Sequence, residues 1–404
     1  MNNETINNVR KMEKTPLVFL FSAWYPTEFH PLLGNFVLNH AKAISKFAKV
    51  IVIYPYEDIE YTQKQKFILE KKQIDNLIEI RIRFKGIKNK TYFAKLVRFI
   101  RNHKAYKKGV RFAIQNYDVP DISHVNVLTR AVLPALKLKK KYKIPFIVTE
   151  HWTRYLPEDN TFNGYFRKKF VRYAVKQADA ITTVSSHLGK AMQNHGLYND
   201  NYHVVPNVFD EDLFYPFAVE KEKKSILHVS SLNYKQKNFA GILQVVNKIA
   251  KRRNDFVLNI IHDSDNSVYL PFVKENHLEN VVIFHGRKSG KELVRYFNEA
   301  DFFLLFSNYE NLPCVIIESF ACGKPVVSTH VGGIAEIVTK ERGILIEMED
   351  ENFLEQAIEY MLDHFQEYDS EAIHGYAIEN FSENAIGEKF WSIYQKVLKQ
   401  NANA

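Results

Sequence analysis

Two glutamates in the last quarter of the chain are placed where they could bind a carbohydrate. Glu310 lies in a polar stretch, and Glu318 follows eight positions later inside an apolar segment. The apolar run at 302–306 predicts a buried strand, and the residues after Pro313 predict a helix over 314–321. Proline suits a helix start because its missing N–H costs nothing there. We therefore expect a strand, a loop that carries one carboxylate and a helix that carries the other.

The start of that helix is suited to an anionic ligand. Its free N–H groups and the positive end of its dipole together favour a diphosphate. The carboxylate in the loop could accept hydrogen bonds from sugar hydroxyls, and Glu318 could accept both hydroxyls of a ribose. A buried carboxylate without a partner would be costly, which favours a functional role for Glu318. The spacing predicts a nucleoside diphosphate sugar laid along the helix.

Other nucleotide and metal motifs are missing from the sequence. It contains no Gly-x-Gly, which excludes the dinucleotide fingerprint, and the stretch GRKSGK at 286–291 is one residue short of P-loop spacing. Neither HExxH nor a paired-cysteine pattern for zinc occurs. Asp263 and Asp265 form an Asp-x-Asp pair after an expected strand, and we interpret this pair as a solvated turn.

Charge divides the chain into two unlike halves. Residues 1–208 hold 35 Lys and Arg against 16 Asp and Glu, a net charge of +19, whereas the rest holds 20 against 30, a net charge of −10. This asymmetry predicts two domains, the first of which meets something anionic.

The densest basic segment, 81–115, has twelve Lys and Arg and no acidic residue. Apolar residues recur at helical spacing from Tyr92 to Ile100, which predicts a basic amphipathic helix. Three interpretations are open: a solvated helix packing its apolar stripe on the domain, a nucleic-acid surface, or contact with an anionic membrane or a phosphate-bearing acceptor. No nucleic-acid-binding motif accompanies the charge, so we favour the third. The contact residues would be Lys95, Arg98, Arg101, Lys104 and Lys108.

Length and composition limit the number of domains and the class of protein. With 404 residues, 46% of them hydrophobic, the chain is long enough for two or three globular domains. Two cysteines cannot form a disulfide framework, the apolar run at 17–21 is too short for a signal peptide, and no stretch is long enough to span a bilayer. We expect a cytoplasmic protein, peripheral on the inner face of the membrane.

Short apolar runs alternate with helical stretches throughout, as in parallel sheets covered by helices. We predict a first domain over 1–208, a linker over 209–224, a second domain over 225–385 and a final helix over 386–404 that is too apolar to stand free. A ligand is expected between the domains, at the carboxyl ends of the strands. The predicted strands lie at 17–22, 50–54, 122–125, 146–149, 180–184 and 205–208, and then at 225–229, 257–262, 281–285, 302–306, 325–328 and 343–346.

The stretch that begins at Glu310 strongly resembles the family 4 (group 1) retaining glycosyltransferases. Their signature has two glutamates separated by seven residues, then GxPVV and a glycine pair, as this chain has in Glu310-Asn311-Leu312-Pro313, Glu318, Gly323-Lys324-Pro325-Val326-Val327, Gly332-Gly333 and Glu336. Weaker likenesses cover the early glycine turn at Gly34, a strand that ends before His151, the helix start at Lys237 and the base-binding loop at Arg287.

The resemblance implies an α/β protein of the GT-B fold, in which two Rossmann-like doubly wound domains face each other across a cleft. The C-terminal helix then packs back on the first domain. The second domain would bind the donor and the first domain the acceptor, with no metal and no other cofactor required.

The resemblance also implies a role for each matching residue. Lys237 would hold the phosphates, Glu310 would contact the sugar and His151 would orient it or assist its departure. The other donor-binding residues would be Gly34, Ser231, Arg287, Asn311, Leu312, Pro313 and Glu318. Ser231 stands where the family usually has an arginine, so it can bond a phosphate but brings no charge; Lys235 or an arginine of the first domain could compensate.

We therefore predict a retaining, metal-independent transferase. It would move a sugar from a UDP- or GDP-sugar to a glycan or a lipid-linked acceptor in cell-surface polysaccharide or glycoconjugate synthesis, with an anionic membrane surface but no nucleic acid as partner. Two alternatives are a nucleotide-sugar epimerase of similar shape and a catalytically silent protein that binds a nucleotide sugar or nucleic acid.

Overall fold

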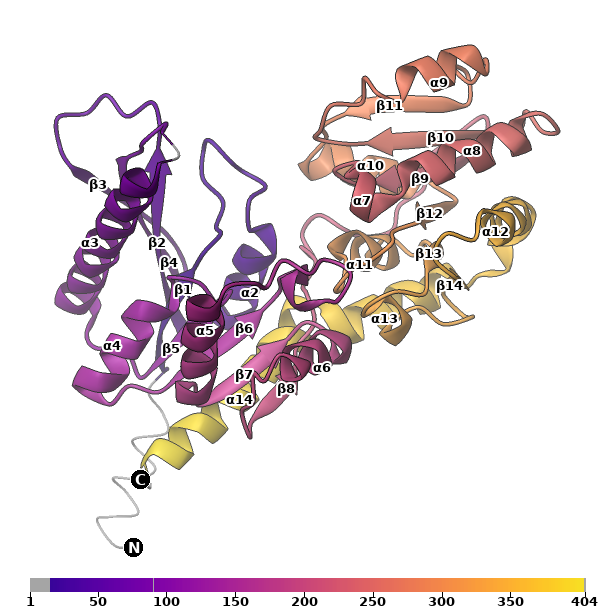
Figure 1. Cartoon of the computed structure of the whole chain (residues 1–404). Coiled ribbons are helices and arrows are strands. Elements are labelled where there is room, and N and C mark those ends of the chain that lie inside the picture. The colour runs from indigo at the N-terminus through magenta and orange to yellow at the C-terminus, as the bar shows by residue number, and fades with distance from the viewer. Residues whose placement is uncertain (1–14, 90, 403–404) are drawn as a thin grey trace, which may run out of the picture.

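The computed structural model describes residues 15–89 and 91–402, which form two α/β halves, each built around its own sheet (Figure 1). The first half contains the strands β1 (Leu17–Ser22), β2 (Lys49–Asp58), β3 (Phe67–Ile74), β4 (Leu77–Lys85), β5 (Ile122–Asn126), β6 (Phe146–Glu150), β7 (Ala180–Thr183) and β8 (Tyr202–Val204). Its helices are α2 (Asn35–Ser45), α3 (Tyr92–Tyr117), α4 (Val132–Tyr142), η1 (Thr153–Tyr155), α5 (Tyr165–Gln177) and α6 (Ser186–Asn194).

The first sheet has the strand order β3-β4-β2-β1-β5-β6-β7-β8, and every neighbouring pair is parallel except β3 with β4. Strand β1 is central, and all six of its residues are buried. A strand covered on both faces reads as a continuous apolar run, which is why β1 was predictable from the sequence.

The pair β3 and β4 was not predicted. Strand β3 is an edge strand, and its last four residues, 71–74, are exposed. Lysines are common on edge strands because they discourage further pairing, and Lys71 and Lys72 occupy this one. The strand therefore lacks the apolar run or the clear alternation that marks other strands in a sequence.

Helices cover both faces of the first sheet. Helices α3, α4, α5 and α6 pack on one face, with Phe19 and Phe21 of β1 in the shared core. The other face is covered by α2 and by α14 (Glu383–Ala402), which packs Ile386, Phe390 and Tyr394 against it. The predicted return of the C-terminal helix to the first domain is thus confirmed (Figure 1).

The second half repeats this layering with the strand order β11-β10-β9-β12-β13-β14, all parallel. Helices α8 and α12 cover one face, and α10, α11 and α13 cover the other. The strands are β9 (Lys224–Val229), β10 (Phe256–Ile261), β11 (Val282–Gly286), β12 (Phe302–Leu305), β13 (Val326–Thr329) and β14 (Gly343–Ile346). The helices are α7 (Tyr234–Lys237), α8 (Phe239–Ala250), α9 (Leu270–Glu275), α10 (Gly290–Glu299), α11 (Cys314–Ala321), η2 (Ile334–Glu336), α12 (Glu351–His364), η3 (Phe365–Glu367) and α13 (Ser370–Phe381).

The chain passes between the halves twice, at neighbouring places. The first passage follows β8, where residues 205–223 form neither helix nor strand, and the second lies between α13 and α14. The backbone N–H of Phe209 donates to the carbonyl of Phe381, so the two passages are bonded to each other. The segment 205–208, which was predicted as a strand, is not one, although the backbone N–H of Val205 donates to the carbonyl of Thr183 at the end of β7.

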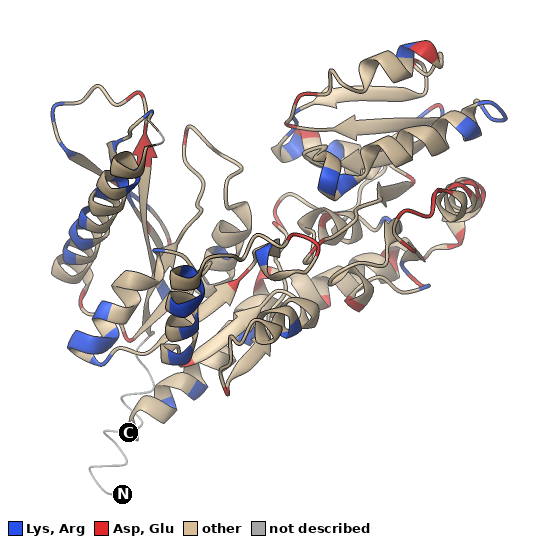
Figure 2. Ribbon diagram, viewed as in Figure 1, with Lys and Arg blue, Asp and Glu red and all other residues tan. Residues whose placement is uncertain are grey.

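The charge asymmetry is visible on the ribbon: basic residues gather on α3, α4 and α5, and acidic residues are frequent along α12 (Figure 2). None of the helices within residues 15–89 and 91–402 is long and apolar enough to cross a bilayer.

Candidate active site

The segment with the two glutamates folds as a strand, a loop and a helix at the edge of the second sheet that faces the first domain. All four residues of β12 are buried, and α11 begins directly after Pro313, whose φ of −69° is compatible with a helix start. No side chain caps the first turn of α11. Its N–H groups therefore keep the capacity to bind an anion.

Glu310 lies buried in this loop and is held by three side chains. Lys237 Nζ forms an ion pair with its carboxylate, Ser307 Oγ donates to Oε1 over 2.9 Å, and Gln236 Nε2 donates to Oε2 over 3.2 Å. Lys237 is the last residue of α7, and Asn238, in the left-handed conformation with φ of 41°, turns the chain into α8. A cation and a carboxylate are thus held together at the mouth of α11.

Glu318 differs from Glu310 because its carboxylate has no hydrogen-bond partner among the described residues. It lies about one turn into α11, and its side chain is partly exposed to the cavity described below. Burial, with a smaller contribution from Asp210, raises the pKa of Glu318 to about 7. A carboxylate in this state gains from any ligand that donates hydrogen bonds to it.

A cavity of about 370 Å³ between the two halves brings most of the predicted donor residues together. Leu32 and Asn35, which flank Gly34, line it from the first domain. The other lining residues include Ser231, Lys237, Arg287, Glu310, Pro313 and Glu318 of the second domain. Residues from six separate segments therefore meet at one place, at the carboxyl ends of the strands, where α/β sheets bind ligands.

Gly34 allows the first domain to approach this closely. It has φ of +75° and precedes α2, and a Cβ atom on it would lie 2.5 Å from the carbonyl carbon of Trp24. Only glycine adopts this conformation at this separation without strain. The turn is thereby packed directly against the backbone that follows β1.

Arg287 and Ser231 lie at the outer side of the cavity. Arg287 is exposed after Gly286, whose φ is +65°, and Ser231 is exposed after β9, where its carbonyl accepts a hydrogen bond from Ser264 Oγ. Lys288 also lines the cavity, although it forms an ion pair with Glu292. Lys235, one of the expected substitutes for the missing arginine, does not line it. Positive charge is therefore supplied by Lys237, Arg287 and Lys288.

His151, Asn311 and Leu312 lie beside the cavity rather than in its wall. Asn311 Nδ2 donates to the carbonyl of His151 over 2.6 Å, and Asn207 Nδ2 donates to the carbonyl of Leu312 over 2.7 Å. The ring of His151 lies 4.5 Å from that of Phe36 and has its Nε2 3.2 Å from Asn126 Oδ1. Burial, followed by repulsion from His40, lowers the pKa of His151 well below its usual value. His151 is thus neutral at pH 7 and can exchange hydrogen bonds but not supply charge.

Glu336, in the segment with the glycine pair, links the two domains by hydrogen bonds to α6. Its carboxylate accepts from the backbone N–H of Ser186 over 2.9 Å, from Ser186 Oγ over 2.7 Å and from the N–H of His187 over 2.9 Å. The positive end of the α6 dipole stabilises a carboxylate at this position. The family signature had singled out Glu336 without assigning it a role.

Two further cavities open at the carboxyl ends of the first sheet, and sequence reasoning did not find them. One of about 270 Å³ is lined by Trp24 and Trp152, whose rings lie 4.8 Å apart, and one of about 250 Å³ is lined by Arg98 and Glu57. Arg130 lines both and forms no ion pair with any described residue. Trp24, Arg130 and Trp152 come from loops after three different strands, and Glu57 and Arg98 come from β2 and α3, so no spacing in the sequence connects them.

Buried Glu150 holds the loop that carries His151 and Trp152. Its carboxylate accepts from the backbone N–H groups of Leu128, His151 and Trp152 over 2.9 to 3.0 Å. Although these bonds favour its charged form, burial outweighs them and raises the pKa of Glu150. Glu150 positions both His151 and Trp152.

The basic residues predicted on α3 separate into two groups. Lys95 and Lys104 are exposed without an ion pair to any described residue, and Lys108 is exposed although it donates to the carbonyl of Phe67. Arg98 and Arg101 instead turn toward the sheet. Arg98 pairs with Glu57 over 3.1 Å, and Arg101 donates to the carbonyl of Lys85 over 2.7 Å. Carboxylate and carbonyl groups at the strand ends thus bind these two arginines, and their assignment to membrane or acceptor contact stays a prediction.

No group of three or more His, Cys, Asp or Glu side chains that could hold a metal ion occurs in the part of the chain that the structure describes. Asp265 accepts from Ser267 in a local turn, whereas Asp263 lines the interdomain cavity.

Comparison with known proteins identifies the family. The model of glycosyl transferases group 1 matches residues 210–377, and the model of glycosyltransferase family 4 matches residues 33–213. The chain belongs to the family 4 (group 1) glycosyltransferases. The two matches meet near residue 210, so this glycosyltransferase has the domain pair of its family along most of its length.

Relatives at 23 to 29% identity have several activities. The chain is 25% identical to N-acetyl-alpha-D-glucosaminyl L-malate synthase of Bacillus anthracis, over 70% of this chain and 76% of that protein. It is 29% identical to a 4-alpha-N-acetylgalactosaminyltransferase of Campylobacter jejuni that acts on a diphospho-undecaprenol-linked saccharide, over 50% of this chain and 56% of that protein. A putative teichuronic acid biosynthesis glycosyltransferase of Bacillus subtilis is 23% identical over 83% of this chain and 86% of its own length.

Solved structures share the fold. Sucrose-phosphate synthase of Thermosynechococcus elongatus superposes with a TM-score of 0.74 at 17% identity, covering 96% of this chain and 100% of that one. HepE of Anabaena, solved with UDP and glucose, gives a TM-score of 0.66 at 16% identity, with 95% of this chain and 100% of that one covered. The predicted GT-B fold of this glycosyltransferase is confirmed.

Proposed function

We propose that the protein transfers a sugar from a nucleoside diphosphate sugar to an acceptor hydroxyl, with retention at the anomeric carbon and without a metal ion. The acceptor is a growing glycan or glycoconjugate precursor. The observation that carries the proposal is the interdomain cavity, in which the unpartnered carboxylate of Glu318, the Lys237–Glu310 pair and the start of α11 converge within the described part of the chain.

The second domain holds the donor in this proposal. The diphosphate lies at the first turn of α11 between Lys237 and Arg287, and the ribose hydroxyls donate to Glu318. The sugar reaches Glu310. The two cations and the helix dipole stabilise the negative charge that develops on the leaving diphosphate, which is the task that a metal ion performs in other transferases.

The first domain presents the acceptor. Trp24 and Trp152 form an apolar wall suited to the face of a sugar ring, and Arg130 is suited to an anionic group of the acceptor. Neutral His151 precedes Trp152 in the loop held by Glu150, and its carbonyl accepts from Asn311 of the donor-binding segment.

The bond changes balance without a further reactant. The bond between the anomeric carbon and the β-phosphate oxygen breaks, and a bond to the acceptor oxygen forms on the same face. The acceptor proton passes to the departing phosphate oxygen. This chain's residues position both partners and exclude water, and the diphosphate itself serves as the base.

Incubation with labelled UDP- and GDP-sugars tests the proposal. Nucleotide release should depend on acceptor, the product should keep the anomeric configuration by NMR, and activity should persist in excess EDTA. Nucleotide release without sugar incorporation into the acceptor would contradict transfer. An inverted product would contradict retention, and loss of activity in EDTA would contradict metal independence. Binding without any turnover would favour a silent binding protein.

A further inference from the structure

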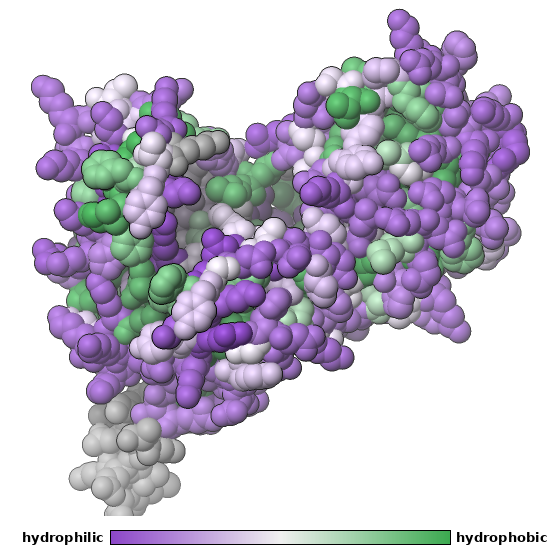
Figure 3. All heavy atoms as spheres, viewed as in Figure 1, coloured by the Kyte–Doolittle hydropathy of each residue, from purple (hydrophilic) through white to green (hydrophobic). Residues whose placement is uncertain are grey.

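The first turns of α3 expose a band of large apolar side chains, Tyr92, Phe93, Leu96, Phe99 and Ile100, referred to below as the α3 band. Phe93 is 73% exposed and Leu96 is 48% exposed. The helix instead buries small residues and one tyrosine, including Ala105, Tyr106 and Gly109, against the sheet. The apolar face thus points away from the domain, contrary to the interpretation in which it packs on the domain, and Figure 3 shows hydrophobic surface along this helix.

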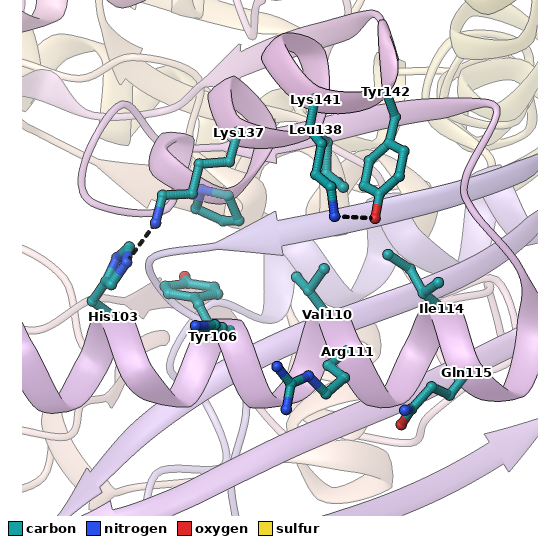
Figure 4. Close-up of a pocket in the computed structure, with 12 residues that line it drawn as sticks. His103, Tyr106, Val110, Arg111, Ile114, Gln115, Lys137, Leu138, Lys141 and Tyr142 are labelled. Carbon is teal, nitrogen blue, oxygen red and sulfur yellow. Dashed lines mark hydrogen bonds between the residues drawn. The ribbon is translucent and has the colours of Figure 1, made fainter.

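The α3 band continues into a groove between α3 and α4. On the α3 side, His103, Val110 and Ile114 follow the band at intervals of three, seven and four residues, so they share its face. Tyr106, at the border with the buried face, also lines the groove. Pro134, Leu138 and Tyr142 of α4 form the opposite wall, and the groove has a volume of about 300 Å³. Figure 4 shows the side chains of both helices pointing into it.

Cations border this apolar surface, and no acid of the described chain lies on it. Lys104, Lys107 and Arg111 are exposed along one side of the α3 band and form no ion pair with any described residue. Lys141 at the rim of the groove donates to Tyr142 Oη over 2.7 Å, and Lys137 Nζ lies 2.6 Å from His103 Nε2. Neither lysine meets a carboxylate in the described part of the chain. A basic helix with an exposed apolar face is the composition that binds anionic bilayers.

The α3 band lies close to the acceptor side of the cleft. Arg98, next to it on the side of the sheet, bonds Glu57 at the carboxyl end of β2 and lines the same cavity as Arg130. A bilayer touching the α3 band would therefore lie beside the cavities to which the acceptor is assigned.

We propose that the α3 band and its bordering cations dock the protein on an anionic lipid bilayer, with Phe93 and Leu96 inserted among the acyl chains. The acceptor then enters the cleft from that surface as a lipid-carried saccharide. The docking stands on the exposed residues alone, whereas the statement about the acceptor rests on the proposed function.

Flotation of the full chain with vesicles tests the docking, without donor or acceptor. Wild type should float with vesicles that contain about 30% phosphatidylglycerol and not with pure phosphatidylcholine. The double variant Phe93→Ser and Leu96→Ser should lower affinity on the order of tenfold, since two apolar side chains no longer insert. The control pair Met348→Ser and Phe353→Ser, which removes comparably exposed apolar groups from the second domain, should float like wild type.

Charge reversal of Lys104, Lys107 and Arg111 to Glu should lower affinity on the order of a hundredfold. The matched reversal of Lys251, Lys274 and Lys291, which are exposed and unpaired within the described second domain, should have little effect. Equal flotation with neutral vesicles, or unchanged flotation of the Phe93 and Leu96 variant, would overturn the proposal. The proposal would also be overturned if light scattering showed a dimer that the Phe93 and Leu96 variant converts to a monomer. The α3 band would then bind a second copy of the chain.

Activity separates the docking from the transfer reaction. A docking variant should transfer sugar normally to a water-soluble acceptor while losing transfer to an acceptor embedded in vesicles. Loss with both acceptors would contradict the docking role, whereas failure of wild type with both would contradict the proposed function and leave vesicle binding as an independent result.

Discussion

The two domains share one architecture but assemble their proposed binding sites in different ways. Both are parallel sheets covered on two faces, and both direct the carboxyl ends of their strands at the cleft. In the second domain, one strand–loop–helix segment supplies Glu310, Pro313 and Glu318. In the first domain, the cleft residues Trp24, Arg130 and Trp152 come from loops after three different strands. Recognition by one continuous segment leaves a fixed spacing in the sequence, and recognition by assembled loops leaves none.

The domains also differ in what they expose. The first has a net charge of +19 over residues 1–208 and places aromatic side chains on the outside of α3, whereas the remainder has a net charge of −10. The first domain is therefore suited to an anionic surface and the second to a small ligand held by specific bonds. Four substitutions test this division, beginning with the one that should reduce transfer most.

Lys237→Met should lower the rate of transfer roughly a thousandfold, because the diphosphate loses the half-buried cation that stabilises its departure in the proposed reaction. The variant also leaves Glu310 without its ionic partner, so the free energy of unfolding should fall by about 3 kcal/mol. Steady-state kinetics and thermal unfolding measure the two effects. Lys235→Met, two positions earlier and exposed, is the control, and a comparable loss in that variant would contradict the role given to Lys237.

Glu318→Gln should weaken binding of a nucleoside diphosphate by roughly tenfold to a hundredfold, since the ribose loses a charged acceptor. Binding in wild type should also tighten between about pH 6 and 8, because the ribose hydroxyls favour the ionised form of a group with a pKa of about 7. Calorimetry at several pH values checks both. A pH profile that Glu318→Gln leaves unchanged would remove Glu318 from the ribose site.

The same variant should affect stability in the opposite direction. The pKa of Glu318 rises from 4.5 to about 7 on folding, so its contribution to the free energy of unfolding is lost as pH rises through this window. The neutral amide of the Glu318→Gln variant has no such loss, and the variant should become more stable than wild type by on the order of 2 kcal/mol above about pH 8. Urea unfolding at about pH 5 and about pH 8 measures this difference, which should be several times smaller at the lower pH because that pH lies just above the unfolded pKa.

Gly34→Ala should destabilise the protein by about 2 kcal/mol, because a Cβ atom there strains the left-handed turn and meets the backbone of Trp24. Transfer should fall with it, since this turn forms the first-domain side of the donor cavity. Gly375→Ala in α13, where a Cβ would meet nothing within 4 Å, should instead be neutral or slightly stabilising. Equal melting temperatures for the two variants would contradict the close approach at Gly34.

Arg130→Gln should raise the KM for an anionic acceptor about tenfold and leave nucleotide affinity unchanged, because Arg130 lines only the first-domain cavities. Arg167→Gln on the exposed start of α5 is the matched control. A loss of nucleotide affinity in Arg130→Gln would contradict the assignment of the acceptor to the first domain and the donor to the second.

Much of the fold and half of the site could be predicted from the sequence. Buried parallel strands such as β1 and β12 read as apolar runs, and Glu310, Pro313 and Glu318 share one segment whose geometry follows from its order. The hairpin of β3 and β4 was missed, because the exposed edge strand carries charges that hide its pairing.

The orientation of α3 could not be obtained from its periodicity. Periodicity identifies an apolar face but not what the face packs against, and Ala105 and Gly109 permit the opposite face to approach the sheet. The bonds of Arg98 and Arg101 could not be predicted for the same reason, since their partners Glu57 and Lys85 lie on strands outside the helix.

A crystal structure of the protein with a nucleoside diphosphate would show whether α11 and Glu318 hold the donor. We expect the diphosphate at the first-turn N–H groups of α11, with Lys237 Nζ within hydrogen-bond distance of a phosphate oxygen and both ribose hydroxyls on Glu318. A nucleotide bound away from α11, or one that leaves Glu318 without a ligand contact, would contradict it.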